Sequence, residues 1–98
     1  MAKSPDWAKV SAVNVLGALQ EFDRLGSQQF FAKHGFAPTT TYALVHDGRT
    51  YPPKAILGTA YELATGTRLA SGEFEGGKAG AVKVLTALGF TVQPIQKH

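Results

Sequence analysis

The residues of this chain best suited to chemistry are cations placed where helices are expected to begin. Lys54 follows Pro52 and Pro53, and a proline at the first helical position loses no hydrogen bond, so a helix should begin at Pro53. A lysine in a first helical turn opposes the helix macrodipole, at a cost of about 0.3–1 kcal/mol. Free N–H groups at a helix start favour anions. Lys54 therefore has two readings, either a contact to an incoming phosphate or an exposed lysine that extends into water.

Arg49 and Tyr51 come just before this lysine, on the second strand of a predicted hairpin. Asp47-Gly48 is a tight-turn signal between two β-rich runs, so residues 41–46 and 49–52 should pair. Arg49, Tyr51 and Lys54 would then form one phosphate-facing corner. In that corner Tyr51 is expected to stack on a base or to position the other groups.

A second lysine, Lys78, follows Gly76 and Gly77 where another helix is expected to start. Residues 72–79 match most of the phosphate-binding loop G-x-x-x-x-G-K-[ST]. We reject a nucleotide site, because Ala79 replaces the hydroxyl that would hold Mg²⁺ and glutamates within the loop would face the phosphates. Two readings remain: Gly76, Gly77 and Lys78 make a second backbone-phosphate contact, or the glycines only serve the path of a flexible loop.

No constellation of residues supports catalysis. The chain has no cysteine, which excludes disulfides, thiolate metal sites and a thiol nucleophile. Its three histidines do not share a metal-ligand spacing, and no carboxylate pair is placed for acid–base work. We therefore expect no catalytic residue, no metal site and no cofactor.

Composition indicates one small domain. The chain has 98 residues, of which 44% are hydrophobic, and a formal net charge of +3. This is apolar enough for a core, and the charge permits nucleic-acid binding without requiring it. No apolar run approaches the ~20 residues of a membrane span. We expect a cytoplasmic domain over residues 1–98, with loose ends at 1–6 and 96–98.

Hydrophobic periodicity predicts the helices that must hold these groups. The first helix should bury a face formed by Ala12, Val15, Leu16, Leu19 and Phe22. Its start has two candidate caps, residues 4–6 and Ser11, and Gly26 should end it. A shorter helix should follow, capped by Ser27 and ended by Gly35.

Two further helices and one strand complete the expected fold. The helix from Pro53 should end at Thr65-Gly66 and bury Ile56, Ala60, Leu63 and Ala64. A fourth helix is expected over about 78–88, and a strand over 90–95 in which Pro94 marks an edge. This order predicts an α+β fold with about four helices and a small, mostly antiparallel three-stranded sheet.

Several strings of residues together resemble a known family. They are Ala18 to Gly26, Phe30 to Phe36 ending in His-Gly-Phe, Tyr42 to Gly48, Tyr51 to Ile56, Phe74 to Gly77 and Leu85 to Phe90. This pattern, over about residues 11–93, resembles the N-terminal head domain of McrA-like, modification-dependent (type IV) HNH restriction endonucleases. The resemblance implies a DNA-binding accessory module whose HNH nuclease and other reader domains lie elsewhere, in cis or in trans.

Together these observations favour a non-catalytic module that binds duplex DNA, plain or modified. Arg49, Lys54 and Lys78 are the expected phosphate contacts. The alternative is a protein-interaction or dimerisation module of such a nuclease, with an exposed apolar patch of Trp7, Val10 and Val13. The sequence does not specify which DNA modification would be read.

Overall fold

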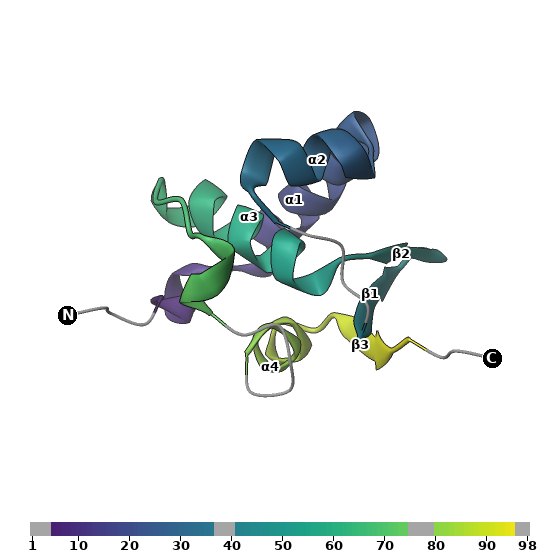
Figure 1. Ribbon diagram of the computed structural model, residues 1–98. Coiled ribbons are helices and arrows are strands. Elements are labelled where there is room, and N and C mark those ends of the chain that lie inside the picture. The colour runs from purple at the N-terminus through teal and green to yellow at the C-terminus, as the bar shows by residue number, and fades with distance from the viewer. Residues whose placement is uncertain (1–4, 37–40, 75–79, 96–98) are drawn as a thin grey trace.

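The structure is a computed structural model that describes residues 5–36, 41–74 and 80–95. Within these ranges the chain follows the predicted order of helix, helix, hairpin, helix, helix and strand, which confirms the α+β fold (Figure 1). The elements are η1 (Trp7–Lys9), α1 (Ala12–Leu25), α2 (Ser27–His34), β1 (Tyr42–His46), β2 (Arg49–Tyr51), α3 (Pro53–Thr65), η2 (Ser71–Glu73), α4 (Ala81–Ala87) and β3 (Thr91–Pro94). None of the described helices is long and apolar enough to cross a membrane.

Side-chain caps and glycines set the helix ends. Ser11 begins α1 with a capping box, because its hydroxyl accepts from the Asn14 N–H while the Asn14 side chain accepts from the Ser11 N–H. Asp6 caps the separate turn η1 instead. Gly26 and Gly35 end α1 and α2 as predicted. Ser27 is the first residue of α2 rather than its cap, which corrects the expectation.

The sheet has the strand order β2-β1-β3, with antiparallel pairs on both sides of β1. Asp47 and Gly48 both adopt positive φ angles, 51° and 77°, as a tight two-residue hairpin turn with the strand-matching twist requires. β3 is an edge strand that ends at Pro94, as predicted. Leu44 lies opposite Tyr51 and Val92, so these three side chains share the sheet face that is turned toward α3.

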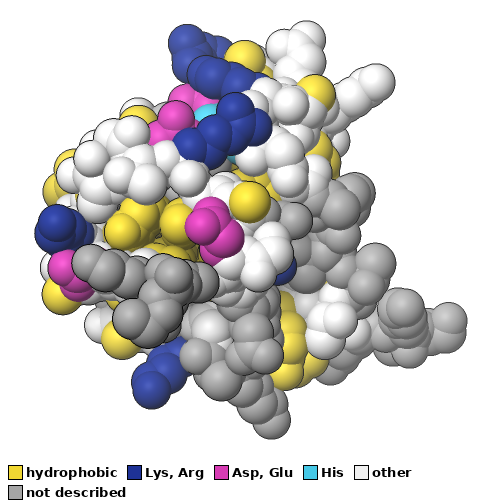
Figure 2. Space-filling view, turned by 60° about the vertical axis from the view of Figure 1, so that its left-hand side comes forward, with side chains coloured by type: hydrophobic (Ala, Val, Ile, Leu, Met, Phe, Trp, Pro, Cys, Tyr) yellow, Lys and Arg dark blue, Asp and Glu magenta, His cyan; other side chains and the backbone are white. Residues whose placement is uncertain are grey.

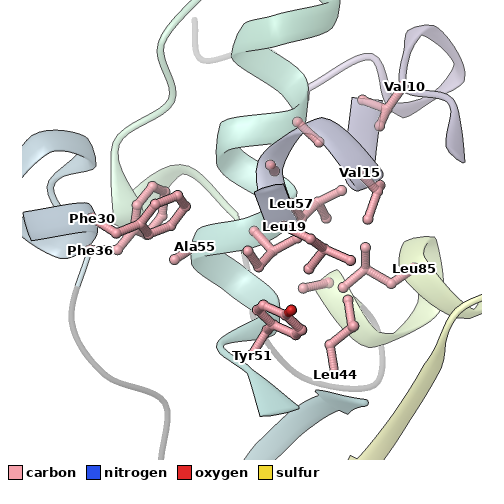
Figure 3. Packing of buried hydrophobic residues seen from close by; sticks show 14 residues of the cluster. Val10, Val15, Leu19, Phe30, Phe36, Leu44, Tyr51, Ala55, Leu57 and Leu85 are labelled. Carbon is pink, nitrogen blue, oxygen red and sulfur yellow. The ribbon is translucent and has the colours of Figure 1, made fainter. Parts of the chain in front are cut away.

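Helix α3 lies at the centre of the molecule, with α1 and α2 on one side and α4 on the other (Figure 1). All of its residues from Ala55 to Ala60 are buried. Figure 3 shows Leu57 of α3 meeting Leu19 of α1 and Leu85 of α4, with Leu44 and Tyr51 entering from the strands. The hairpin leads directly into the start of α3. Because α3 is held in the core, its packing fixes the direction of the hairpin.

Three apolar residues lie differently from the sequence prediction. Leu16 and Leu63 are 38% and 51% exposed, although both were expected on buried helix faces. The buried stripe of α1 runs through Val15, Ala18 and Leu19, which places Leu16 on its flank. Val10, in contrast, is only 4% exposed, so the predicted surface patch of Trp7, Val10 and Val13 does not form.

Gly58 allows an aromatic ring to lie directly on the backbone of α3. A Cβ atom at this position would stand 2.4 Å from Cζ of Phe36. Phe36 also meets Phe74 edge to face, with 6.0 Å between ring centroids. Phe36 is therefore a core residue, and its packing ties the chain after α2 to the middle of α3.

Candidate nucleic-acid interface

Arg49, at the start of β2, is joined to Tyr51 by an acidic residue from α1. One guanidinium nitrogen of Arg49, Nη1, lies 3.2 Å from Oδ1 of Asp23. The Tyr51 hydroxyl donates to the same carboxylate and lies 3.0 Å from each of its oxygens. The Arg49 side chain remains 68% exposed in spite of this contact. The structure thus brings two of the predicted site residues together through a third.

Tyr51 is a core residue with a polar tip. Only 5% of it is exposed, because strand alternation turns it to the core face with Leu44. Its ring meets Phe22 edge to face at 5.3 Å between centroids. Burial, and then the bond to Asp23, raise the pKa of the Tyr51 hydroxyl above its usual value. The expected stacking on a base does not fit this position, whereas a positioning role does.

Lys54 occupies the first turn of α3, as predicted, and has a partner that the sequence did not indicate. Its ammonium nitrogen lies 5.4 Å from the centroid of the Phe74 ring, and the residue is half-buried. This is cation–π geometry. Lys54 therefore covers an aromatic ring, while Arg49 pairs with Asp23. The single corner predicted for Arg49, Tyr51 and Lys54 is divided between these two separate contacts.

The second predicted phosphate contact is not described. Gly76, Gly77 and Lys78 lie outside the described residues. Helix α4 is described from Ala81, three residues after the predicted start.

A cleft of about 430 Å³ separates α1 from the hairpin, and the Asp23 carboxylate lies in it. Its lining is formed by Leu16, Leu19, Gln20, Asp23, His46, Asp47, Arg49 and Tyr51. His46 packs against Phe90 and lies 3.6 Å from a carboxylate oxygen of Asp47. With two carboxylates and one guanidinium, the cleft itself has no excess of positive charge. Among the residues that line the cleft, the exposed side chain of Arg49 is the most suitable group to bind an anion.

Asp23 is the site residue that sequence reasoning missed. It lies 28 positions before Tyr51 and on a polar flank of α1, where nothing local distinguishes it from other surface carboxylates. Only the packing of the hairpin against α1 brings it to Arg49.

A second charged cluster ties the end of α2 to α1 and α3. His34 is 7% exposed, its Nε2 contacts the Glu21 carboxylate, and its Nδ1 lies 3.6 Å from Glu62. Partial burial raises the pKa of Glu21, but His34 and Lys33 outweigh this effect, so the net pKa lies below the ordinary value. Figure 2 shows acidic and basic side chains gathered around a histidine on this face. Within the described ranges no cluster of side chains is suited to a metal ion.

Comparison with known proteins places this fold in a family. The family model described as "ScoMcrA-like, N-terminal head domain" matches residues 8–94. The chain is also similar to a solved structure, "Structure of the Type IV phosphorothioation-dependent restriction endonuclease ScoMcrA", with 31% identity and a TM-score of 0.67. The match covers 92% of this chain and 14% of that one, so this chain corresponds to a small part of its relative. No curated protein matches. These findings confirm the resemblance seen in the sequence, and the chain belongs to the ScoMcrA-like N-terminal head domain family.

Proposed function

We propose that this chain is a non-catalytic accessory module that binds duplex DNA for a restriction endonuclease. Arg49 is the main phosphate contact among the described residues. The observation that supports this role most directly is the exposure of the Arg49 side chain at the hairpin, 68% in spite of its ion pair. The HNH nuclease and other reader domains would act from elsewhere, in cis or in trans, and a cytoplasmic location goes with that role.

The geometry of Arg49 leaves hydrogen-bond donors free for a phosphate. Its contact to Asp23 uses Nη1, and a guanidinium carries five N–H donors in a rigid fork. Arginine binds phosphate through two parallel hydrogen bonds of this fork. The net charge of +3 adds a general attraction to DNA.

Lys54 is a weaker, second contact in this proposal. Among the described residues no carboxylate forms an ion pair with it. Its ammonium group lies over Phe74, so a phosphate near the start of α3 would be attracted to it.

The experiment is a salt titration of DNA affinity for the wild type and two charge-matched variants. Non-specific binding with a dissociation constant in the range of about 10⁻⁴ to 10⁻⁶ M is expected, and it should weaken as salt rises. Arg49→Ala should weaken binding and reduce the salt slope by about one unit. Arg68→Ala removes the same charge beyond the far end of α3, a helix about 20 Å long that begins at the hairpin, and should have a smaller effect. Absence of binding at low salt on plain, base-methylated and phosphorothioated duplexes would refute the proposal.

A second candidate is a protein-interaction or dimerisation module. The observation that favours it is a set of exposed apolar side chains on α1 and α3, with Val13 at 74% and Leu63 at 51% exposure. A Cβ at Gly17 of α1 would lie 3.2 Å from the Leu63 side chain, so Leu63 covers the seam between the two helices. Sedimentation of the wild type and of Val13→Gln tests this role. Self-association that the variant abolishes, without DNA binding, would favour the second candidate.

A further inference from the structure

We propose that Asp23, held in place by Tyr51, is the positioning residue that orients Arg49 for a DNA phosphate. This inference rests on the proposed function, because it requires Arg49 to contact DNA. Asp23 itself touches no DNA in this arrangement. It acts through the side chain of Arg49.

The anchor of this arrangement is part of the hydrophobic core. The Tyr51 ring is buried against Phe22, so its hydroxyl has little freedom to move. That hydroxyl lies 3.0 Å from both oxygens of Asp23 and donates to the carboxylate. A hydrogen bond to a charged group is stronger than one between neutral groups. The carboxylate is therefore fixed relative to the sheet as well as to α1.

The orienting contact engages one end of the Arg49 fork. Oδ1 of Asp23 meets Nη1 at 3.2 Å, while the Arg49 side chain stays 68% exposed. A free arginine loses much rotamer freedom when it binds. An arginine already held in one direction loses less, so the contact lowers the ordering cost of phosphate binding. The carboxylate also offsets part of the positive charge of Arg49, and the experiment must separate these two effects.

Tyr51→Phe is the variant that separates them, because it removes the anchor without changing any charge. The ring and its packing on Phe22 are retained. Asp23 is 39% exposed at its side chain, so water can replace the lost hydroxyl and the variant should fold. We expect its dissociation constant for duplex DNA to rise about three- to tenfold at fixed salt, the cost of ordering one long side chain. The salt slope should stay unchanged, because the number of phosphate contacts is the same.

Tyr61→Phe is the matched control. The Tyr61 hydroxyl also has a partner, since it accepts from the Asp6 N–H, but that contact links α3 to the N-terminal turn. Its loss should leave DNA affinity unchanged. Thermal melting of both variants establishes that they are folded before affinities are compared.

A double-mutant cycle of Tyr51→Phe with Arg49→Ala decides whether the Tyr51 anchor acts through Arg49. In the Arg49→Ala background, Tyr51→Phe should have no further effect on affinity, whereas a general structural loss would add to it. Three outcomes overturn the positioning role: additive effects, no effect of Tyr51→Phe alone, or tighter binding, which would show that Asp23 only masks Arg49. In each of these the proposed function stands if Arg49→Ala alone weakens binding. If Arg49→Ala has no effect, the proposed phosphate contact fails and the positioning role fails with it.

Discussion

Replacing Gly58 with alanine tests the packing that supports the start of α3. The new Cβ would stand 2.4 Å from Cζ and 3.0 Å from Cε2 of Phe36, and 3.3 Å from Cζ of Phe74. Contacts below 3.0 Å require movement, yet Phe36 is only 8% exposed and is packed edge to face against Phe74. Phe74 in turn carries Lys54 over its ring. A shift of the two rings would therefore reach the predicted DNA-binding side of the domain.

The expected magnitude is a balance of two terms. Alanine in place of glycine inside a helix stabilises by about 0.8–1 kcal/mol, because it restricts the unfolded chain. Inserting a methyl group into a well-packed core costs about 1–3 kcal/mol. We therefore expect Gly58→Ala to lower the free energy of unfolding by about 0–2 kcal/mol.

Gly17→Ala provides a matched control within α1. It has the same helix-propensity gain, but its new Cβ would meet only Leu63 Cδ1 at 3.2 Å. Leu63 is 51% exposed and can move aside, so this variant should be as stable as the wild type or more stable. The propensity terms cancel between the variants, which leaves a difference of about 1–3 kcal/mol from packing alone.

Thermal unfolding followed by circular dichroism measures this difference. For a domain of this size each kcal/mol shifts the Tm by about 4–8 °C, so Gly58→Ala should melt at least about 4 °C below Gly17→Ala. Combining Gly58→Ala with Phe36→Leu should cost less than the sum of the two changes, because the shorter side chain makes room for the methyl group. Equal or reversed melting temperatures for the two alanine variants would refute the reasoning.

Three further predictions concern charged residues. Lys54→Ala should lower stability by about 0.5 kcal/mol in urea titrations, because the lost contact to Phe74 outweighs the relief of dipole repulsion; a gain in stability would contradict this. Asp47→Asn should tighten DNA binding about two- to threefold in fluorescence anisotropy, the effect of a unit charge about 7 Å from a phosphate in water, while asparagine tolerates the left-handed φ of 51°. Because the folded pKa of Glu21 lies below its ordinary value of 4.5, its contribution to stability is complete above about pH 4.5 and is lost as the pH falls through the folded pKa. Glu21→Gln should flatten this acid dependence, and an unchanged profile would show that contacts such as that to His34 do not control it.

Local sequence signals determined the order of the elements in this protein. Ser11 with Asn14, the positive-φ pair Asp47-Gly48, and Pro53 at a helix start each act through hydrogen bonds or backbone angles within a few residues. Such signals are readable without knowing the fold. The family resemblance was equally visible, because the short strings that match the family are spread over most of the chain.

Helix periodicity predicted burial less well. Three- and four-residue spacing places Leu16 and Leu63 next to the buried stripes, but the width of each stripe depends on how closely the neighbouring helix approaches. Gly17 lies under Leu63, and Leu63 covers the seam between α1 and α3 without entering the core.

Only the tertiary structure decided the partners of the candidate DNA-binding residues. Asp23 reaches Arg49 and Tyr51 because the hairpin packs beside α1, and Phe74 reaches Lys54 because the chain after α3 returns to the start of that helix. These contacts join residues that are far apart in the sequence, so no spacing within the sequence indicates them. The sequence by itself therefore determined which elements form and which cations they carry. The three-dimensional packing of α1, the hairpin and α3 determined which of those cations are paired, covered or free to meet a phosphate, because pairing depends on distances that only the folded chain establishes.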